Sequence, residues 1–145
     1  MKLGIFLIIT TLGAFVSCTN NAGQLAEERK ENFAALLEKP TEISFEEDAF
    51  DFGKVVDGEK VQHTFHFTNT GDKSLVLIDV KGSCGCTVPE NWPKAPIQPG
   101  ETAQIDVTFD SKNRVGIVRK TVRIQANTNP SVTTLTITGE VTEKI

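Results

Sequence analysis

From residue 41 onward, short segments in which apolar and polar residues alternate recur along the chain. They are rich in Val, Ile, Thr and Phe, and they read ISFEEDAFDFG, KVQHTFHFTN, SLVLIDVKG, TAQIDVTFD, VGIVRKTVRIQA and TTLTITGEV. Turn-forming clusters divide them, namely VDGE, NTGDK, QPGE, SKNR and NTNP. Strands at this spacing, with no convincing helix among them, predict an all-β fold, an antiparallel β-sandwich of about seven strands.

The alternation also assigns side chains to faces. Phe65 and Phe67 fall on one side of the segment KVQHTFHFTN and are expected to point into the core. His63 shares that side, so we expect it to lie inside the sandwich or at its rim, while His66 faces the other way. Phe109 ends a second such series in TAQIDVTFD.

The N-terminus has the pattern of an export signal. Lys2 precedes an apolar run over residues 3–12, and the small-residue sequence AFVSC leads to Cys18. This ending resembles a bacterial lipobox, which implies a lipoprotein signal peptide over residues 1–17 and a lipid on Cys18. The protein would then be held by that lipid to a membrane of the bacterial cell envelope. A plain signal peptide and an uncleaved anchor are the alternatives.

Residues 18–40 differ from the rest of the chain. A polar stretch, TNNAG, is followed by GQLAEERKENFAALLEKP, which contains many good helix formers and ends at Pro40. We therefore expect a tether and a short helix over residues 18–40, followed by one sandwich domain over residues 41–145.

Composition narrows the class of function. The net charge is −4 and the chain has no run of Lys or Arg, so nucleic acid is not an expected partner. Neither a GxSxG nor an HExxH motif occurs, and no Gly-rich phosphate-binding loop leads into a helix. The sequence predicts a protein that is not an enzyme and that carries no cofactor.

Several short sequence motifs occur in a specific order along the chain. FDFG precedes the first hairpin, FTNTG follows the second strand, and then come SCGCT and QPGE. Over about residues 45–141 this order resembles the bacterial domain of unknown function 1573. That family is immunoglobulin-like and similar to Hydin-type and major-sperm-protein-type sandwiches. The resemblance implies such a fold and an envelope location, and it implies no activity.

Cys84 and Cys86 flank a single glycine in the stretch KGSCGCTVPENWP. If the segment were extended, the two Cα atoms would lie roughly 6.6–7.2 Å apart, at or beyond the usual disulfide limit. The parallel thiols could then bind a soft metal. A turn at Gly85 would instead allow a disulfide in a small ring. Packed small residues or a tight disulfide, a reversible redox pair and a metal clip all remain open.

A metal site would need a third ligand, and His63 is the candidate beside Cys84 and Cys86. A histidine on an apolar strand face is more often a packed residue with one hydrogen-bond partner. Trp92 follows the cysteines in PENWPKAP. We expect it to cap the end of the sandwich, and the alternative is an exposed anchor for a partner.

Two functional hypotheses follow. The first is a membrane-anchored binding or assembly module, which docks a protein partner of the cell envelope, for example as an added strand on a sheet edge. The alternative is a lipoprotein that handles thiol redox chemistry, copper or zinc through Cys84 and Cys86.

Overall fold

The computed structural model describes residues 21–144, which form one helix and eight strands. The helix is α1 (Asn21–Leu37). The strands are β1 (Ile43–Phe45), β2 (Ala49–Val56), β3 (Lys60–Asn69), β4 (Leu77–Gly82), β5 (Thr87–Glu90), β6 (Thr102–Asp110), β7 (Gly116–Ala126) and β8 (Val132–Thr142).

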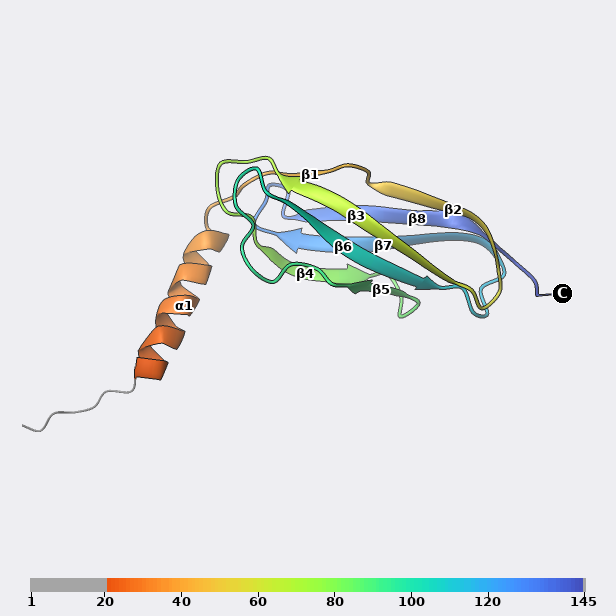
Figure 1. Cartoon of the computed structure of the whole chain (residues 1–145), viewed down its shortest axis with the longest axis horizontal. Coiled ribbons are helices and arrows are strands. Elements are labelled where there is room, and N and C mark those ends of the chain that lie inside the picture. Colours follow the sequence, from red (N-terminus) through yellow and green to blue (C-terminus); the bar gives the residue numbers. More distant parts are fainter. Residues whose placement is uncertain (1–20, 145) are drawn as a thin grey trace, which may run out of the picture.

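The strands form a sandwich of two four-stranded sheets (Figure 1). One sheet has the order β1-β3-β6-β5 and the other has the order β2-β8-β7-β4. The β-sandwich predicted from the alternation is therefore present. β3 and β6 have the boundaries that their alternation predicts, Lys60–Asn69 and Thr102–Asp110.

The sandwich departs from the prediction in two respects. It has eight strands, because the acidic residues after Phe45 divide ISFEEDAFDFG between the two sheets, and because Thr87–Glu90 forms the additional strand β5. It is also not wholly antiparallel, since β2 runs parallel to β8. The chain crosses from one sheet to the other between β1 and β2, and the direction of β2 follows from that crossing.

Two clusters of buried side chains fill the space between the sheets. The larger one includes Phe65 and Phe67 of β3 together with Ile124 of β7. The smaller one, which we call the distal core, consists of Cys86, Phe109, Val118 and Val141. Phe109 lies near the end of β6, Val118 near the start of β7 and Val141 near the end of β8, and these strand ends lie away from α1 (Figure 1).

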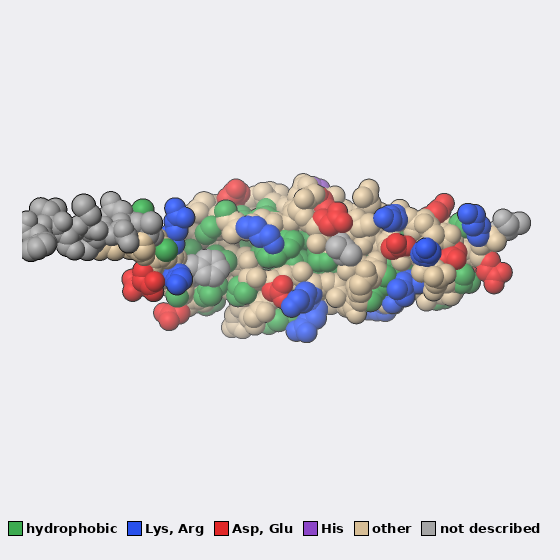
Figure 2. All heavy atoms as spheres, turned by 90° about the horizontal axis from the view of Figure 1, so that it is seen from below, with side chains coloured by type: hydrophobic (Ala, Val, Ile, Leu, Met, Phe, Trp, Pro, Cys, Tyr) green, Lys and Arg blue, Asp and Glu red, His purple; other side chains and the backbone are tan. Residues whose placement is uncertain are grey.

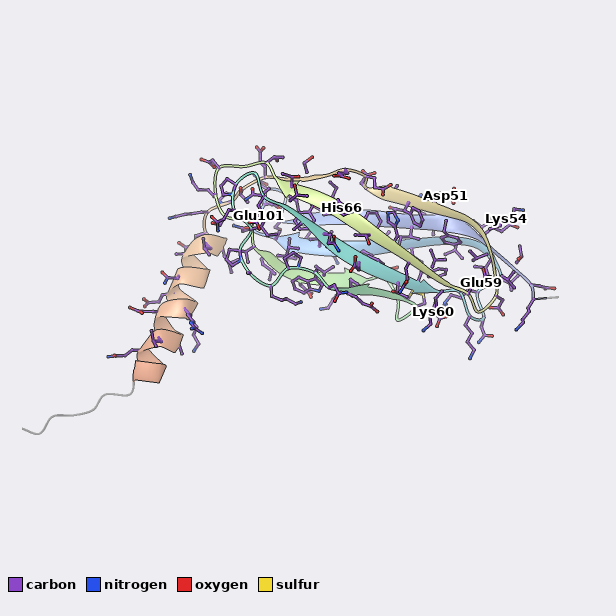
Figure 3. The ribbon with its side chains drawn as sticks, in the orientation of Figure 1. Asp51, Lys54, Glu59, Lys60, His66 and Glu101 are labelled. Atoms are coloured by element: carbon purple, nitrogen blue, oxygen red, sulfur yellow. A yellow bond between two sulfur atoms is a disulfide. The ribbon has the colours of Figure 1, made fainter. Side chains whose placement is uncertain are left out.

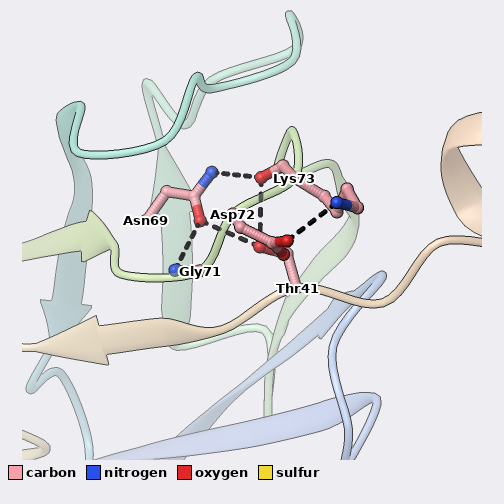
Figure 4. Close-up of polar contacts among 5 residues, drawn as sticks. All are labelled: Thr41, Asn69, Gly71, Asp72 and Lys73. Atoms are coloured by element: carbon pink, nitrogen blue, oxygen red, sulfur yellow. Dashed lines mark hydrogen bonds and ion pairs between the residues drawn. The ribbon is translucent and has the colours of Figure 1, made fainter.

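At the opposite end, a buried asparagine secures a turn. The side chain of Asn69 donates to the carbonyls of Lys73 (2.7 Å) and Ile97 (2.9 Å). Its Oδ1 accepts from the Thr41 hydroxyl (3.1 Å) and from the backbone N–H of Gly71 (3.2 Å), as Figure 4 shows. Every polar group of this fully buried amide therefore has a partner, which is the condition for burying it without a large desolvation cost.

A second asparagine joins α1 to the sandwich. The two N–H groups of the Asn127 amide lie within hydrogen-bond distance of three carbonyls, those of Leu36 (3.0 Å), Lys39 (3.1 Å) and Ser74 (2.9 Å), so that one N–H is shared between two of them. The Asn127 Oδ1 accepts from the backbone N–H of Val76 at 2.7 Å. The C-terminal end of the helix is thus hydrogen-bonded to the domain that follows it.

Candidate functional site

Cys84 and Cys86 are joined by a disulfide. Their Cα atoms lie 5.2 Å apart, which is shorter than an extended Cys-Gly-Cys segment allows. The chain turns at Gly85 and Cys86 before β5 begins at Thr87. The Cys-Gly-Cys segment therefore forms a turn and is not extended.

Backbone hydrogen bonds hold the cysteine loop on both sides. The Ser83 N–H donates to the Thr121 carbonyl of β7 (2.8 Å), and the Ser83 hydroxyl oxygen accepts from the Thr121 N–H (3.1 Å). The N–H of Asp110 donates to the Cys86 carbonyl at 2.8 Å. A Cβ at position 82 would overlap the Thr87 carbonyl, so Gly82 is needed for the chain to pass this close.

The two sulfurs have different surroundings. Cys86 is 5 % exposed and belongs to the distal core, whereas Cys84 is only partly buried and packs against that core. The hydroxyl oxygen of the buried Thr87 lies 3.7 Å from the Cys84 sulfur and 3.9 Å from the Cys86 sulfur. The loop therefore combines a reachable sulfur, a buried sulfur and a hydroxyl that contacts both.

His63 is packed at the rim of the sandwich. Its ring stacks on Phe50 with the centroids 3.7 Å apart, and it meets the Phe65 ring edge-on. Its Nε2 lies 2.7 Å from a carboxylate oxygen of Glu47. Within residues 21–144, no three His, Cys, Asp or Glu side chains are grouped so as to hold a metal ion, and His63 is therefore not assembled with the two cysteines.

Trp92 lies in the loop after β5. It is partly buried against the larger core cluster, and the Lys94 ammonium lies 2.7 Å from the centroid of its ring. Its ring thus contacts the core and the Lys94 side chain.

Cys18 and the predicted signal peptide lie outside the described residues. In the part of the chain that is described, no helix is both long enough and apolar enough to cross a membrane.

A group of exposed apolar side chains, not predicted from the sequence as a site, lies at the end of the sandwich away from α1. We call Val56, Val115 and Ile117 the distal apolar face. They are 38 %, 53 % and 84 % exposed. The signal was present in the sequence, because Ile117 falls on the opposite face of its strand from the buried Val118.

The strand register brings these side chains together. Glu140 of β8 lies opposite Ile117 of β7 on one side and opposite Lys54 of β2 on the other. Lys54 and Glu140 form an ion pair of 2.9 Å. Further along β8, Val56 of β2 lies opposite Thr142. On the other side of β8, Gly116 is the partner of Val141, and Val115 directly precedes Gly116. An open groove of about 450 Å³ crosses the three strands beside Ile117, which is the member of the distal apolar face that lines it.

Charges of both signs surround the apolar positions. The groove is lined by Lys54 and Arg119 as well as Asp51 and Glu140, and Lys54 and Asp51 project from β2 in Figure 3. Over the face that Figure 2 presents, Lys and Arg side chains are likewise mixed with Asp and Glu, without a continuous basic stripe. A continuous basic stripe is the usual electrostatic feature of a surface that binds a polyanion.

Residues 43–141 match the model of the family described as protein of unknown function (DUF1573). No curated protein sequence matches the chain.

Among solved structures, a protein of unknown function from Porphyromonas gingivalis W83 is similar over 75 % of this chain and 51 % of its own, with 19 % identity and a TM-score of 0.58. The VesB protease of Vibrio cholerae is similar over 77 % of this chain and 34 % of its own, with 14 % identity and a TM-score of 0.55. The ASH/PapD-like domain 7 of human CEP192 is similar over 95 % of this chain and 100 % of its own, with 12 % identity and a TM-score of 0.53.

The chain spans about half or less of the two bacterial proteins, and all three identities are low. These similarities establish the immunoglobulin-like fold, and the domain from CEP192 shows that the fold can make up the whole of a matched chain.

Proposed function

Because the chain belongs to the DUF1573 family of proteins of unknown function, we propose a role from the structure itself: it is a non-enzymatic docking module that binds a protein partner. A lipid on Cys18 would hold it to a membrane of the cell envelope. The partner would dock on the distal apolar face. The observation that carries this proposal is Ile117, an isoleucine in the regular strand β7 that is 84 % exposed.

The position of Ile117 supports a binding role. Single exposed apolar residues are common on protein surfaces, but a cluster of them rimmed by charges is typical of an interaction site. Ile117 lies in the same corner of the sheet as Val56 and Val115, and the Lys54–Glu140 ion pair borders it. A partner that inserts an apolar side chain into the groove would bury Ile117, and a broader contact would also cover Val56 and Val115.

The sheet edges are less suited to docking. β1 has three residues, and β5 contains Pro89, which lacks an N–H for a new ladder. β2 has a bulge at which the Gly53 N–H already bonds to the Asp51 side chain at 2.8 Å, and β4 has a register shift after Leu77. Such features oppose the addition of a strand. The face of the sheet is therefore the better docking surface.

The end of the sandwich that carries this face also favours docking. α1 is attached at one end of the domain. Val56 is the last residue of β2 and Ile117 the second residue of β7, and these strand ends lie at the other end (Figure 1). A tether on the N-terminal side of α1 would leave the distal apolar face free to meet another protein.

The test compares two isoleucines of the same sheet. Ile117→Glu is expected to abolish capture of the partner from solubilised envelope, whereas Ile78→Glu on β4, also an exposed position, should leave capture unchanged. Thermal unfolding of both variants controls for the fold. Equal capture by the two variants would contradict docking at this face.

The anchor requires a separate test. In the producing bacterium, Cys18→Ser should abolish labelling by a fatty acid and should release the protein from the membrane fraction. Labelled protein from the Cys18→Ser variant would refute the lipid attachment and would leave the docking test unaffected.

A further inference from the structure

We propose that the Cys84–Cys86 disulfide is a thiol-exchange site, at which a peptide thiol attacks Cys84 and Cys86 is the leaving group. This inference is independent of docking at the distal apolar face. It assigns a chemical role to a loop that the docking function does not use.

The disulfide contributes little to the stability of the fold. It joins residues only two positions apart. In the chain-entropy account, the stabilisation by a cross-link grows with the size of the closed loop, so a ring this small is the least effective kind. The fold also holds the loop without it, through the bonds from Ser83 to Thr121 and from Asp110 to Cys86. Stability alone does not explain the bond.

The unequal exposure of the two cysteines gives the exchange a direction. A thiolate must reach the sulfur that it attacks. Cys84 is partly exposed, and a Cβ added at Gly85 would meet no atom within 4 Å, so the tip of the loop faces open space. Cys86 is 5 % exposed within the distal core. Attack is therefore directed to Cys84.

Thr87 supplies a group for the departing sulfur. Its side chain is 2 % exposed, and both polar contacts that the structure gives its hydroxyl are to the two sulfurs. When the bond breaks, this hydroxyl can donate to the Cys86 thiolate. A hydrogen bond to the charged form of a group favours that form, so Thr87 would assist its departure.

The exchange proceeds in two balanced steps. A peptide thiolate forms a bond to the Cys84 sulfur, and the Cys84–Cys86 bond breaks with its electron pair on Cys86. A second peptide thiolate then attacks the peptide sulfur of this mixed disulfide, and Cys84 leaves as a thiolate. The peptide dithiol loses two electrons and becomes a disulfide, while Cys84 and Cys86 gain them and take up two protons.

The first test uses the full-length chain with Cys18→Ser, in which Cys84 and Cys86 are the only cysteines. Reduced glutathione is the probe, and alkylation followed by intact mass measures the opened fraction. Opening without denaturant is expected. A disulfide that glutathione opens only when the protein is unfolded would overturn the proposal. This measurement needs no substitution in the pair.

The second test uses two matched variants in that background. Cys86→Ser keeps Cys84, and Cys84→Ser keeps Cys86. With glutathione disulfide, Cys86→Ser should form the mixed disulfide at least about tenfold faster than Cys84→Ser, because reaction follows access. Equal rates, or a faster reaction at Cys86, would contradict the assignment of Cys84. Circular dichroism verifies that both variants are folded.

The third test concerns Thr87. Thr87→Val removes the hydroxyl at nearly constant volume and should slow opening by glutathione about fivefold, whereas Thr87→Ser keeps a hydroxyl and should restore the rate. A Thr87→Val protein that opens at the parent rate would show that the hydroxyl does not assist the leaving sulfur.

Discussion

Phe52 of β2 packs directly against Gly139 of β8, so closely that any side chain at position 139 would overlap its ring. The bulge between Asp51 and Lys54 sets Phe52 at this point of the ladder. The Phe52 ring also stacks on Phe109 of the other sheet, with the centroids 5.5 Å apart. Phe52 therefore connects the parallel strand pair to the distal core.

This contact predicts the effect of a single methyl group. Gly139→Ala should lower the free energy of unfolding by roughly 1–3 kcal/mol, because the Phe52 ring must move within a packed interior. Gly23→Ala is the matched control, since no atom lies within 4 Å of the added Cβ and the residue is in a helix. It should be neutral or stabilising by up to about 1 kcal/mol. Urea denaturation measures both, and similar values would contradict the contact.

The Asn69 turn gives a second prediction. Asn69→Ala leaves the Lys73 and Ile97 carbonyls and the Gly71 N–H without this partner. Because lost partners of buried groups cost about 1–3 kcal/mol each where water cannot replace them, we expect a loss of roughly 2–4 kcal/mol in unfolding free energy. Thr68→Ala breaks only the exposed bond to Thr102 and should cost about 0.5 kcal/mol or less. A comparable loss in the two variants would refute the role of Asn69.

Replacing both cysteines should leave the fold intact. For Cys84→Ser with Cys86→Ser we expect a loss of roughly 1–3 kcal/mol, from the small cross-link, the buried sulfur and the introduced hydroxyls. The measurement is urea denaturation of both proteins, with far-UV circular dichroism to verify the strands. A variant that does not fold would show that the disulfide is a structural requirement.

Asp72 predicts a pH dependence. A hydrogen bond from Lys73, and then the charge of Lys73, lower the pKa of the Asp72 carboxyl from 3.8. A lowered folded-state pKa stabilises the fold above the unfolded-state value, and this contribution is lost as the pH falls through the lowered pKa. Wild type should therefore melt slightly above Asp72→Asn at neutral pH, and the difference should vanish in acid.

Salt gives the control for this pair. Because the carboxyl is exposed, the difference in melting temperature between wild type and Asp72→Asn should also shrink in roughly 1 M salt, where the screening length is about 3 Å. A difference that is independent of both salt and pH would show that the carboxylate charge is not its source.

The strands were predictable where one face is buried and the other is exposed. Phe65, Phe67 and Phe109 alternate strictly with polar residues, and each is fully buried as predicted. β5 was not predicted, because it has only four residues, includes Pro89 and follows a turn. It is a strand because it pairs with β6, and its own sequence pattern does not indicate one. The parallel direction of β2 depends on the crossing between sheets, which no local pattern encodes.

The site was predictable in part. The spacing of Cys84 and Cys86 allowed either an extended segment or a turn, and the choice depends on Gly82 and Thr87 passing at close contact, a tertiary feature. The stacking of His63 on Phe50 could not be predicted, because the two residues lie on different sheets. Ile117 was visible as an apolar residue on an outward position, but its neighbours Val56 and Val115 come together only through the register of β2, β8 and β7.

Because α1 is attached to the sandwich through Asn127, the helix can act as a spacer. One side chain bonds to the Leu36 and Lys39 carbonyls, so the C-terminal end of the helix is attached directly to the sandwich. Its 17 residues correspond to about 25 Å of length. In a chain fastened at its N-terminus, α1 would separate the sandwich from the point of attachment by up to about this length, and lengthening or shortening α1 by one turn would change that limit by about 5 Å.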